Sequence, residues 1–351
     1  MIMVAISIVA IFAFAMLAID LSLLMLAKNQ LQNAADAAAL AGALALGLYG
    51  GDQGLATSEA ELIAGLNMAV QDQQRPVLID AGDIVFPEDN KITVTTHRTV
   101  ATNDPVTLYF MNVLDQTIGK QGEITARATA AVYPVSGTNC LKPWCFPDKW
   151  DDANNDSIYD AGEFYDTYIT GYKVPDDIGT QIILKLRNGN HSPRMGWYYA
   201  IDFAPINTGD PVVTGADAYR EWIGYCEPYL VSIGDQLQIE PGNMVGPTAQ
   251  GIQVLIDQDP NAQWDEATGT VINSAFPTSP RVIMMCVFDP SVGVQTDVNG
   301  RDYLTVVNIV AVFLEEHFTS DVTGRFMRRA TGGDPCPDCP EGFLFTPVLV
   351  E

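Results

Sequence analysis

The chain has 351 residues and a formal net charge of −25, because 43 acidic residues stand against only 18 basic ones. This length allows two or three domains with a sizeable core. A surface this acidic repels nucleic acid and anionic lipid and attracts divalent cations, so nucleic-acid binding is not expected.

The first predicted element is an apolar helix. No charged residue occurs from Met1 to Ile19, and Asp20 alone interrupts the apolar run from Ile2 to Ala27. About 20 such residues, at about 1.5 Å each, cross a bilayer. No basic residue precedes the run, and helix-forming sequence follows it where a signal peptide would be cleaved. Two interpretations stay open, a plain membrane anchor and a mature N-terminus whose basic leader was removed, and the abrupt start favours the second.

An alanine-rich segment continues this helix to about residue 48. It contains no proline and consists mainly of residues that helices tolerate, so the whole helix would be roughly 70 Å long. Four of its alanines share one face, and small side chains let helix backbones approach closely. Good helix propensity alone explains them equally well. They are Ala34, Ala38, Ala41 and Ala45.

The sequence pattern of residues 51–135 predicts a small α+β unit. A glycine-rich break ends the long helix, and Ser58 with Glu61 forms a capping box for a second helix that runs to about Gln74. Alternating apolar residues then predict a hairpin and a further strand, and Asp104 is expected to start another helix. The expected strands are residues 78–86, 91–100 and 124–133.

The sequence of residues 136–351 predicts a loop segment followed by a strand-rich head. Residues 136–170 are rich in Asp, Asn, Pro and Cys, which is typical of a connection tied down by cross-links. Residues 171–351 contain apolar runs of strand length, such as RVIMMCVFD and YLTVVNIVAVFLEE, with helical segments near 215–229 and 247–257. The fold class is therefore predicted as α+β, with a long N-terminal helix over residues 1–50, the small α+β unit and the larger head.

All six cysteines follow the apolar helix, which fits a disulfide-forming compartment. Spacing does not decide their pairing. In one interpretation all six cysteines form disulfides. The two close pairs then form either a bond within each pair or bonds between the pairs, and Cys226 is bonded to Cys286. The rival is a zinc site built from both close pairs, although CPDC is only half of such a site. The close pairs are Cys140 with Cys145 and Cys336 with Cys339.

The segment DANNDSIYDAGE, residues 152–163, carries oxygen-bearing residues at the spacing of an EF-hand calcium loop. Ser157 stands where such loops normally have glycine, and no flanking helices are evident. An Asp/Asn-rich turn on an acidic surface is the alternative. A bound Ca²⁺ would have a structural role, because it would neutralise carboxylates and stiffen the loop. The candidate ligands are Asp152, Asn154, Asp156, the Ile158 carbonyl, Asp160 and Glu163.

The segment AIDLSLLMLAKNQLQNAADAAALAGALAL resembles the N-terminal segment of the TadE/TadG-like pilus-assembly family. The matching residues are Asp20, Lys28, Leu31, Gln32, Asn33, Ala34, Ala35 and Asp36. The resemblance implies a type IV pilin-like protein, with an inner-membrane helix, a leader removed by a prepilin peptidase, Tad-type secretion machinery and a periplasmic or extracellular head. It makes Met1 the residue after the cut. Ala5 departs from the glutamate of commoner pilins, and the D-x-S-x-S metal motif of some large Tad proteins does not occur.

Asp20 lies within apolar sequence, where an ionised carboxylate costs at least about 2.5 kcal/mol. One interpretation places it at the lipid headgroups, with residues 1–19 as the span. The other places it inside a bundle of copies, paired with an amine terminus or with Lys28, where it would set the register of assembly. The predicted assembly residues are Met1, Asp20, Lys28, Ala34, Ala38, Ala41 and Ala45.

The sequence contains no G-x-S-x-G, H-E-x-x-H or Walker motif, and its three histidines lie far apart. No enzymatic activity is therefore expected. The predicted function is that of a pilin-like structural subunit. Its copies pack through their N-terminal helices, first anchored in the inner membrane with a periplasmic head and later in an extracellular filament. The alternative is a membrane-anchored assembly factor or surface binding module that does not polymerise.

Overall fold

The computed structural model describes residues 2–69, 75–108, 121–187, 192–315 and 321–350. They divide into two compact units. Unit 1 comprises Met1–Tyr133 and Pro347–Glu351, and unit 2 comprises Pro134–Thr346. Unit 2 is therefore inserted in the chain between two segments of unit 1. Each unit contains both helices and strands, so the predicted α+β class is confirmed.

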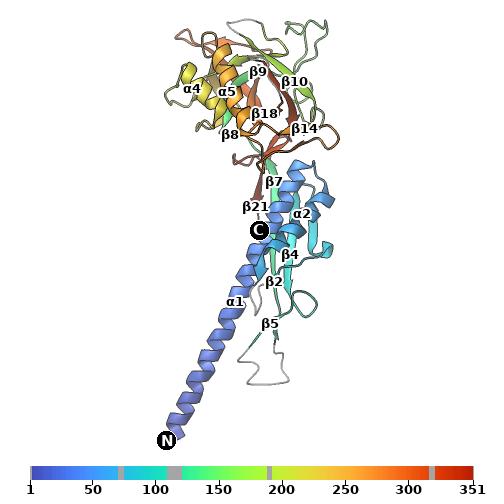
Figure 1. Cartoon of the computed structure of the whole chain (residues 1–351), viewed down its shortest axis with the longest axis vertical. Coiled ribbons are helices and arrows are strands. Elements are labelled where there is room, and N and C mark those ends of the chain that lie inside the picture. The colour runs from blue at the N-terminus through green and yellow to red at the C-terminus, as the bar shows by residue number, and fades with distance from the viewer. Residues whose placement is uncertain (1, 70–74, 109–120, 188–191, 316–320, 351) are drawn as a thin grey trace. The chain divides into compact units, whose positions relative to one another are not determined.

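The described part of unit 1 has two α-helices, α1 (Ile2–Leu48) and α2 (Gln53–Leu66), which pack side by side (Figure 1), and one 3-10 helix, Ala81–Asp83. The side chain of Asp52 caps α2, because it accepts a hydrogen bond from the Leu55 N–H at 2.9 Å. The predicted start of this helix at Ser58 is therefore wrong. An N-cap residue closer to the end of α1 starts the helix earlier.

The predicted hairpin of unit 1 consists of β3 (Ile84–Glu88) and β4 (Lys91–Arg98), and β4 pairs antiparallel with β7 (Ile124–Pro134). The first strand begins at Ile84 rather than at residue 78. A helix is predicted to start at Asp104, but residues 106–107 form a short strand, and the rest of the predicted helix lies outside the described residues. The short strands are β1 (Met68–Ala69), β2 (Arg75–Pro76), β5 (Val106–Thr107) and β6 (Gln121–Gly122).

Six strands of unit 2 pair in a closed ring. They are β9 (Leu141–Pro147), β10 (Gln181–Arg187), β11 (Trp197–Ala200), β16 (Val282–Phe288), β18 (Asp302–Leu314) and β19 (Val322–Met327). Pairing runs from β18 through β16, β9, β11 and β10 to β19, which pairs again with β18. β16 lies between two neighbours and is buried along its whole length, as its unbroken apolar sequence predicts.

Two helices pack beside this ring, α4 (Ala216–Gly224) and α5 (Val245–Gln258), and α4 contacts both α5 and β9 (Figure 1). α4 lies within the predicted segment 215–229, and α5 covers the predicted segment 247–257 and extends beyond it at both ends. The remaining strands are β8 (Gly137–Thr138), β12 (Val231–Ser232), β13 (Gln236–Gln238), β14 (Gln263–Asp265), β15 (Thr270–Ile272), β17 (Gln295–Thr296), β20 (Arg329–Ala330) and β21 (Leu344–Leu349). The chain after Thr346 belongs to unit 1, where the Val350 N–H donates to the Thr129 backbone carbonyl at 2.9 Å.

Candidate functional site

The N-terminal part of α1 is the first candidate. Between Met3 and Ile19 most large apolar side chains are exposed, with Met3 at 84% and Phe14 at 73%. Length and composition allow this helix to cross a membrane, and only 6% of its apolar window is buried. About 17 residues rise about 26 Å, close to the thickness of a hydrocarbon core. The exposed residues from Met3 to Ile19 can therefore be buried in lipid or against other helices. Met1, a predicted assembly residue, lies outside the described residues.

Asp20 marks the point where α1 begins to pack against its own unit. It is 3% exposed, whereas its neighbour Ile19 is 53% exposed. Ala27 and Leu31 follow on the same face at helical spacing and are also buried. Lys28, the predicted partner, is exposed. The single chain thus already buries Asp20. After it, α1 has one buried face, while Leu21, Met25 and Leu26 remain exposed on the rest of the helix.

The alanine face of α1 is used inside unit 1. Three of its four members are at most 2% exposed, and they cluster with alanines of α2 and with Ile92 of β4. A Cβ added at Gly42 would lie 3.5 Å from the Ala60 Cβ and 3.2 Å from the Ala56 oxygen, so the two helices approach closely. The predicted role of this face between copies is corrected, because α2 and β4 occupy it. Its members are Ala34, Ala38, Ala45 and the half-buried Ala41.

The predicted calcium loop is held by hydrogen bonds between its own side chains and backbone. Asp152 Oδ2 accepts from the Ser157 N–H at 2.9 Å, and Glu163 Oε1 accepts from the Ala153 N–H at 3.1 Å. Ser157 has a φ of 64°, the left-handed conformation that favours glycine, so the serine makes the turn itself.

The other predicted ligands lie in the same loop. Asp156 Oδ1 accepts from the Ile158 N–H at 2.7 Å, and the Asn154 amide donates to Asp160 Oδ2 at 3.1 Å. Over the ranges that the structure describes, no three His, Cys, Asp or Glu side chains are grouped in a way that would hold a metal ion. The loop thus brings the candidate residues near one another with their oxygens engaged by the loop itself.

The disulfides differ in part from the prediction. They are Cys140–Cys226 and Cys336–Cys339. The second is the predicted local loop, but the Cys226–Cys286 bridge and the Cys140/Cys145 loop are wrong. Cys145 of β9 lies opposite Cys286 of β16, and both are buried free thiols. Burial raises the pKa of Cys145 well above its usual value. The zinc alternative is wrong as well, because three of its four cysteines are in disulfides.

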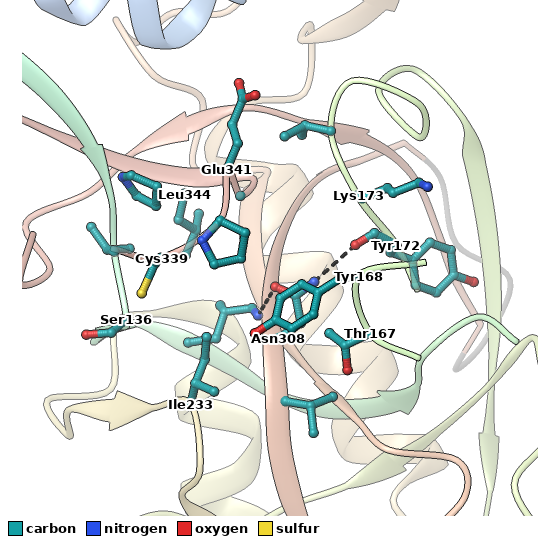
Figure 2. A pocket seen from close by; sticks show the side chains of 17 residues that line it. Ser136, Thr167, Tyr168, Tyr172, Lys173, Ile233, Asn308, Cys339, Glu341 and Leu344 are labelled. Carbon is teal, nitrogen blue, oxygen red and sulfur yellow. Dashed lines mark hydrogen bonds between the residues drawn. The ribbon is translucent and has the colours of Figure 1, made fainter. Parts of the chain in front are cut away.

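A pocket of about 510 Å³ in unit 2 was not predicted. Figure 2 shows its mainly apolar lining, with Tyr168 and Asn308 between a wall that carries Cys339 and a wall that carries Tyr172. The Asn308 side-chain amide donates to the Tyr172 backbone carbonyl at 3.1 Å, and Asn308 Oδ1 accepts from the Ile309 N–H at 2.8 Å. Asn308 therefore ties β18 to the loop that forms one wall.

Asp148 holds the same loop, which contains Tyr165 and Tyr172, through hydrogen bonds. Its buried carboxylate accepts hydrogen bonds from the Tyr172 N–H at 2.7 Å and from the Tyr165 hydroxyl at 3.0 Å. Burial raises the pKa of Asp148 to about 6, although these donors and nearby Lys149 oppose the shift. Gly171 allows this approach, since a Cβ there would lie 2.5 Å from Asp148 Oδ2.

Sequence reasoning missed this pocket because its lining comes from separate segments of unit 2 that carry no shared motif. Three segments far apart in the chain, around residues 134–136, 167–174 and 339–344, meet at β18. The one signal was the CPDC sequence, whose second cysteine lines the pocket.

These features define a protein with a long N-terminal helix, whose apolar stretch has about the length of a membrane span, and an α+β unit in which a second, strand-rich unit is inserted. The family model described as putative Flp pilus-assembly TadE/G-like matches residues 1–45, which confirms the resemblance over that segment. No characterised protein and no solved structure matches the chain. The match ends within α1, and it indicates a protein associated with Tad pili.

Proposed function

We propose that this chain is a pilin-like structural subunit of a Tad-type pilus. The N-terminal part of α1 holds it in the inner membrane, with the rest of the chain in the periplasm, until copies pack through that helix into an extracellular filament. The exposed apolar stretch from Met3 to Ile19, in a segment that matches the TadE/G-like family, carries this proposal. A prepilin peptidase and the Tad secretion machinery are the partners that such a role requires, and the role is structural rather than enzymatic.

The hydrophobic effect supplies the driving force. Covering exposed apolar surface is worth about 25 cal/mol per Å². Lipid covers the stretch before assembly, and neighbouring copies cover it afterwards. Because α2 and β4 already cover the face that includes Ala34 and Ala38, the contacts between copies involve the exposed apolar side chains of α1, which lie mainly before Asp20.

The second candidate is a membrane-anchored assembly factor that never polymerises. The length of the exposed stretch favours it, since the residues before Asp20 suffice for one bilayer crossing. Electron microscopy of material sheared from cells, with mass spectrometry of the intact N-terminus, separates the two functions. Filaments rich in this chain support the subunit. A chain that stays wholly in the membrane fraction contradicts it.

Replacing Phe12 with aspartate is expected to impair insertion and assembly together. Phe12 is 62% exposed near the middle of the apolar stretch, and an aspartate there costs about 2.5–3.5 kcal/mol of insertion free energy, equivalent to about 100-fold. Membrane fractionation and filament yield measure the effect. Leu66→Asp is the matched control, because Leu66 of α2 is 68% exposed. A similar loss in both variants would show that the position in α1 is irrelevant.

We also propose that the loop Asp152–Glu163 binds one Ca²⁺ through the oxygens predicted above. The left-handed turn at Ser157 supports this, because it supplies the sharp bend that such a loop needs at its sixth position. Calcium would draw the carboxylates away from their hydrogen bonds to the loop backbone, so the cation and the backbone compete for the same oxygens. The expected role is to stiffen the loop.

Calcium is therefore expected to stabilise unit 2, by about 2.7 kcal/mol at a concentration about 100 times the Kd, and a chelator should reverse the gain. Thermal unfolding of the full chain with and without EDTA measures it. Asp152→Asn should remove most of the shift, whereas Asp257→Asn, an exposed acid outside the loop, should keep it. An unchanged melting temperature in the unmodified chain would count against the calcium site.

A further inference from the structure

The disulfide Cys336–Cys339 is the weaker structural cross-link of the two disulfides. Its cysteines are three residues apart in CPDC, whereas Cys140 and Cys226 are 86 residues apart. A disulfide stabilises a fold mainly by restricting the unfolded chain, and that restriction grows with the length of the closed loop. The surroundings of this disulfide indicate a chemical role in addition to its contribution to stability.

A partner can reach this disulfide. The tail from Asp334 to Gly342 forms no helix or strand, and each of its residues is half-buried or exposed. Its backbone is nevertheless held, since the Cys336 N–H donates to the Pro134 oxygen at 2.8 Å and the Cys339 N–H donates to the Cys336 oxygen at 3.1 Å. The disulfide is thus both accessible and fixed in place.

Cys339 also lies on the wall of the 510 Å³ pocket. Figure 2 shows its side chain on the same side as Leu344 and Ser136, across from Tyr172 and Lys173. The lining between these walls is mainly apolar. A molecule held in the pocket would therefore have its apolar part next to this sulfur.

The charges beside the disulfide are acidic. Asp334 and Asp338 are exposed and flank or interrupt the CPDC sequence. Glu341 of the same tail pairs with Arg328, and Lys173 across the pocket pairs with an aspartate of its own loop. Arg328 and Lys173 thus each have a carboxylate partner. The tail from Asp334 to Gly342 contains no basic residue, so its own charge is negative.

We propose that Cys336–Cys339 is a thiol–disulfide exchange site for thiols that carry positive charge, and that the adjoining pocket receives the apolar flank of such a thiol. The acidic tail attracts a cationic thiol and repels an anionic one such as glutathione. This activity goes beyond the structural role proposed above and does not depend on polymerisation.

The exchange has two balanced steps. The thiolate of the partner attacks the Cys339 sulfur, the bond to Cys336 breaks, and Cys336 leaves as a thiolate that takes up a proton. A second thiol of the partner then attacks the mixed disulfide and releases Cys339. The CPDC disulfide is the oxidant, because it gains the two electrons and two protons that the partner's two thiols lose. No other reagent is needed for one round.

The acidic residues beside the disulfide also explain why a cationic thiol reacts faster than an anionic one. A thiolate leaving beside Asp338 is destabilised, so attack by a neutral or anionic thiol is slow. A cation on the incoming thiol offsets this repulsion at the moment when negative charge appears on the leaving sulfur. Added salt screens both effects and should reduce the preference.

The test compares cysteamine with 3-mercaptopropionate, two small thiols of opposite charge, on the purified full chain. Alkylation at timed intervals and peptide mapping by mass spectrometry follow each disulfide separately. After correction for thiolate fraction, cysteamine is expected to open Cys336–Cys339 about 10-fold faster at low salt, and the ratio should fall to about 2 in about 0.5 M NaCl. Equal rates for the two thiols at low salt would overturn the proposal.

Two variants test the parts of the site. Asp338→Asn is expected to lower the cysteamine preference about 3-fold, whereas Asp210→Asn, at an exposed position elsewhere in unit 2, should leave it unchanged. A cysteine peptide with lysine and leucine flanks tests the pocket. Tyr168→Ala should slow this peptide and not cysteamine. A preference that survives Asp338→Asn intact overturns the charge selection, and a peptide rate that Tyr168→Ala leaves unaltered overturns the role of the pocket.

Discussion

Replacing Cys140 with serine is expected to lower the free energy of unfolding of unit 2 by about 4–5 kcal/mol. The disulfide to Cys226 spans 86 residues of the chain, a loop that includes β9, β10, β11 and α4. Without it, the unfolded chain gains the conformational freedom that the bond had removed. By the same relation, Cys336→Ser is expected to cost only about 2 kcal/mol, because its loop is so short.

Tryptophan fluorescence can follow this loss in unit 2 alone, because all five tryptophans of the chain lie within Pro134–Thr346. Urea unfolding of the two single variants and of the unmodified chain gives the comparison. The double variant Cys140→Ser, Cys226→Ser controls for the thiol left behind in the single variant. Equal losses for the long and the short disulfide would contradict the explanation from loop length.

A second large effect is expected from Gly324→Ala, because Gly324 lies where the ring of strands closes. It pairs with Leu314 of β18, and a Cβ at this position would lie 2.4 Å from the Phe313 backbone oxygen and 2.4 Å from Val312 Cγ1. Backbone of a paired strand cannot move aside as a flexible side chain can. We therefore expect a loss of about 3 kcal/mol in the free energy of unfolding, with β19 displaced from β18.

The control is Gly332→Ala, where an added Cβ would meet nothing within 4 Å. Unfolding followed by fluorescence and by far-UV circular dichroism compares the two variants. Gly332→Ala should behave like the unmodified chain. If Gly324→Ala behaved in the same way, β18 and β19 would not be packed as closely as described.

Elements with a strong local pattern could be predicted from the sequence. α1 follows from an unbroken helical composition, the β3–β4 hairpin from alternating residues around a turn, and β16 from a continuous apolar run. Helix starts were less predictable, because Asp52 and Ser58 both have side chains that cap helices. Only the place where α1 ends decides that Asp52 caps α2.

Features that depend on a partner far away in the chain could not be predicted. The alanine face of α1 has the same sequence whether it packs on a copy or on α2 of its own chain. The pairing of Cys226 with Cys140 rather than Cys286 depends on β9 and β16 being neighbours, which places Cys145 and not Cys140 opposite Cys286. The pocket is formed by loops, and no periodicity specifies how loops meet.

The insertion of unit 2 has a consequence for synthesis on the ribosome. The residues after Thr346 include Val350, which bonds to Thr129 of β7, yet they are translated only after the entire inserted unit. While unit 2 is emerging, that side of β7 still awaits its neighbour and exposes unpaired backbone groups. A nascent chain in this state is open to mispairing with other chains, so rapid folding of the inserted unit would shorten the interval of risk.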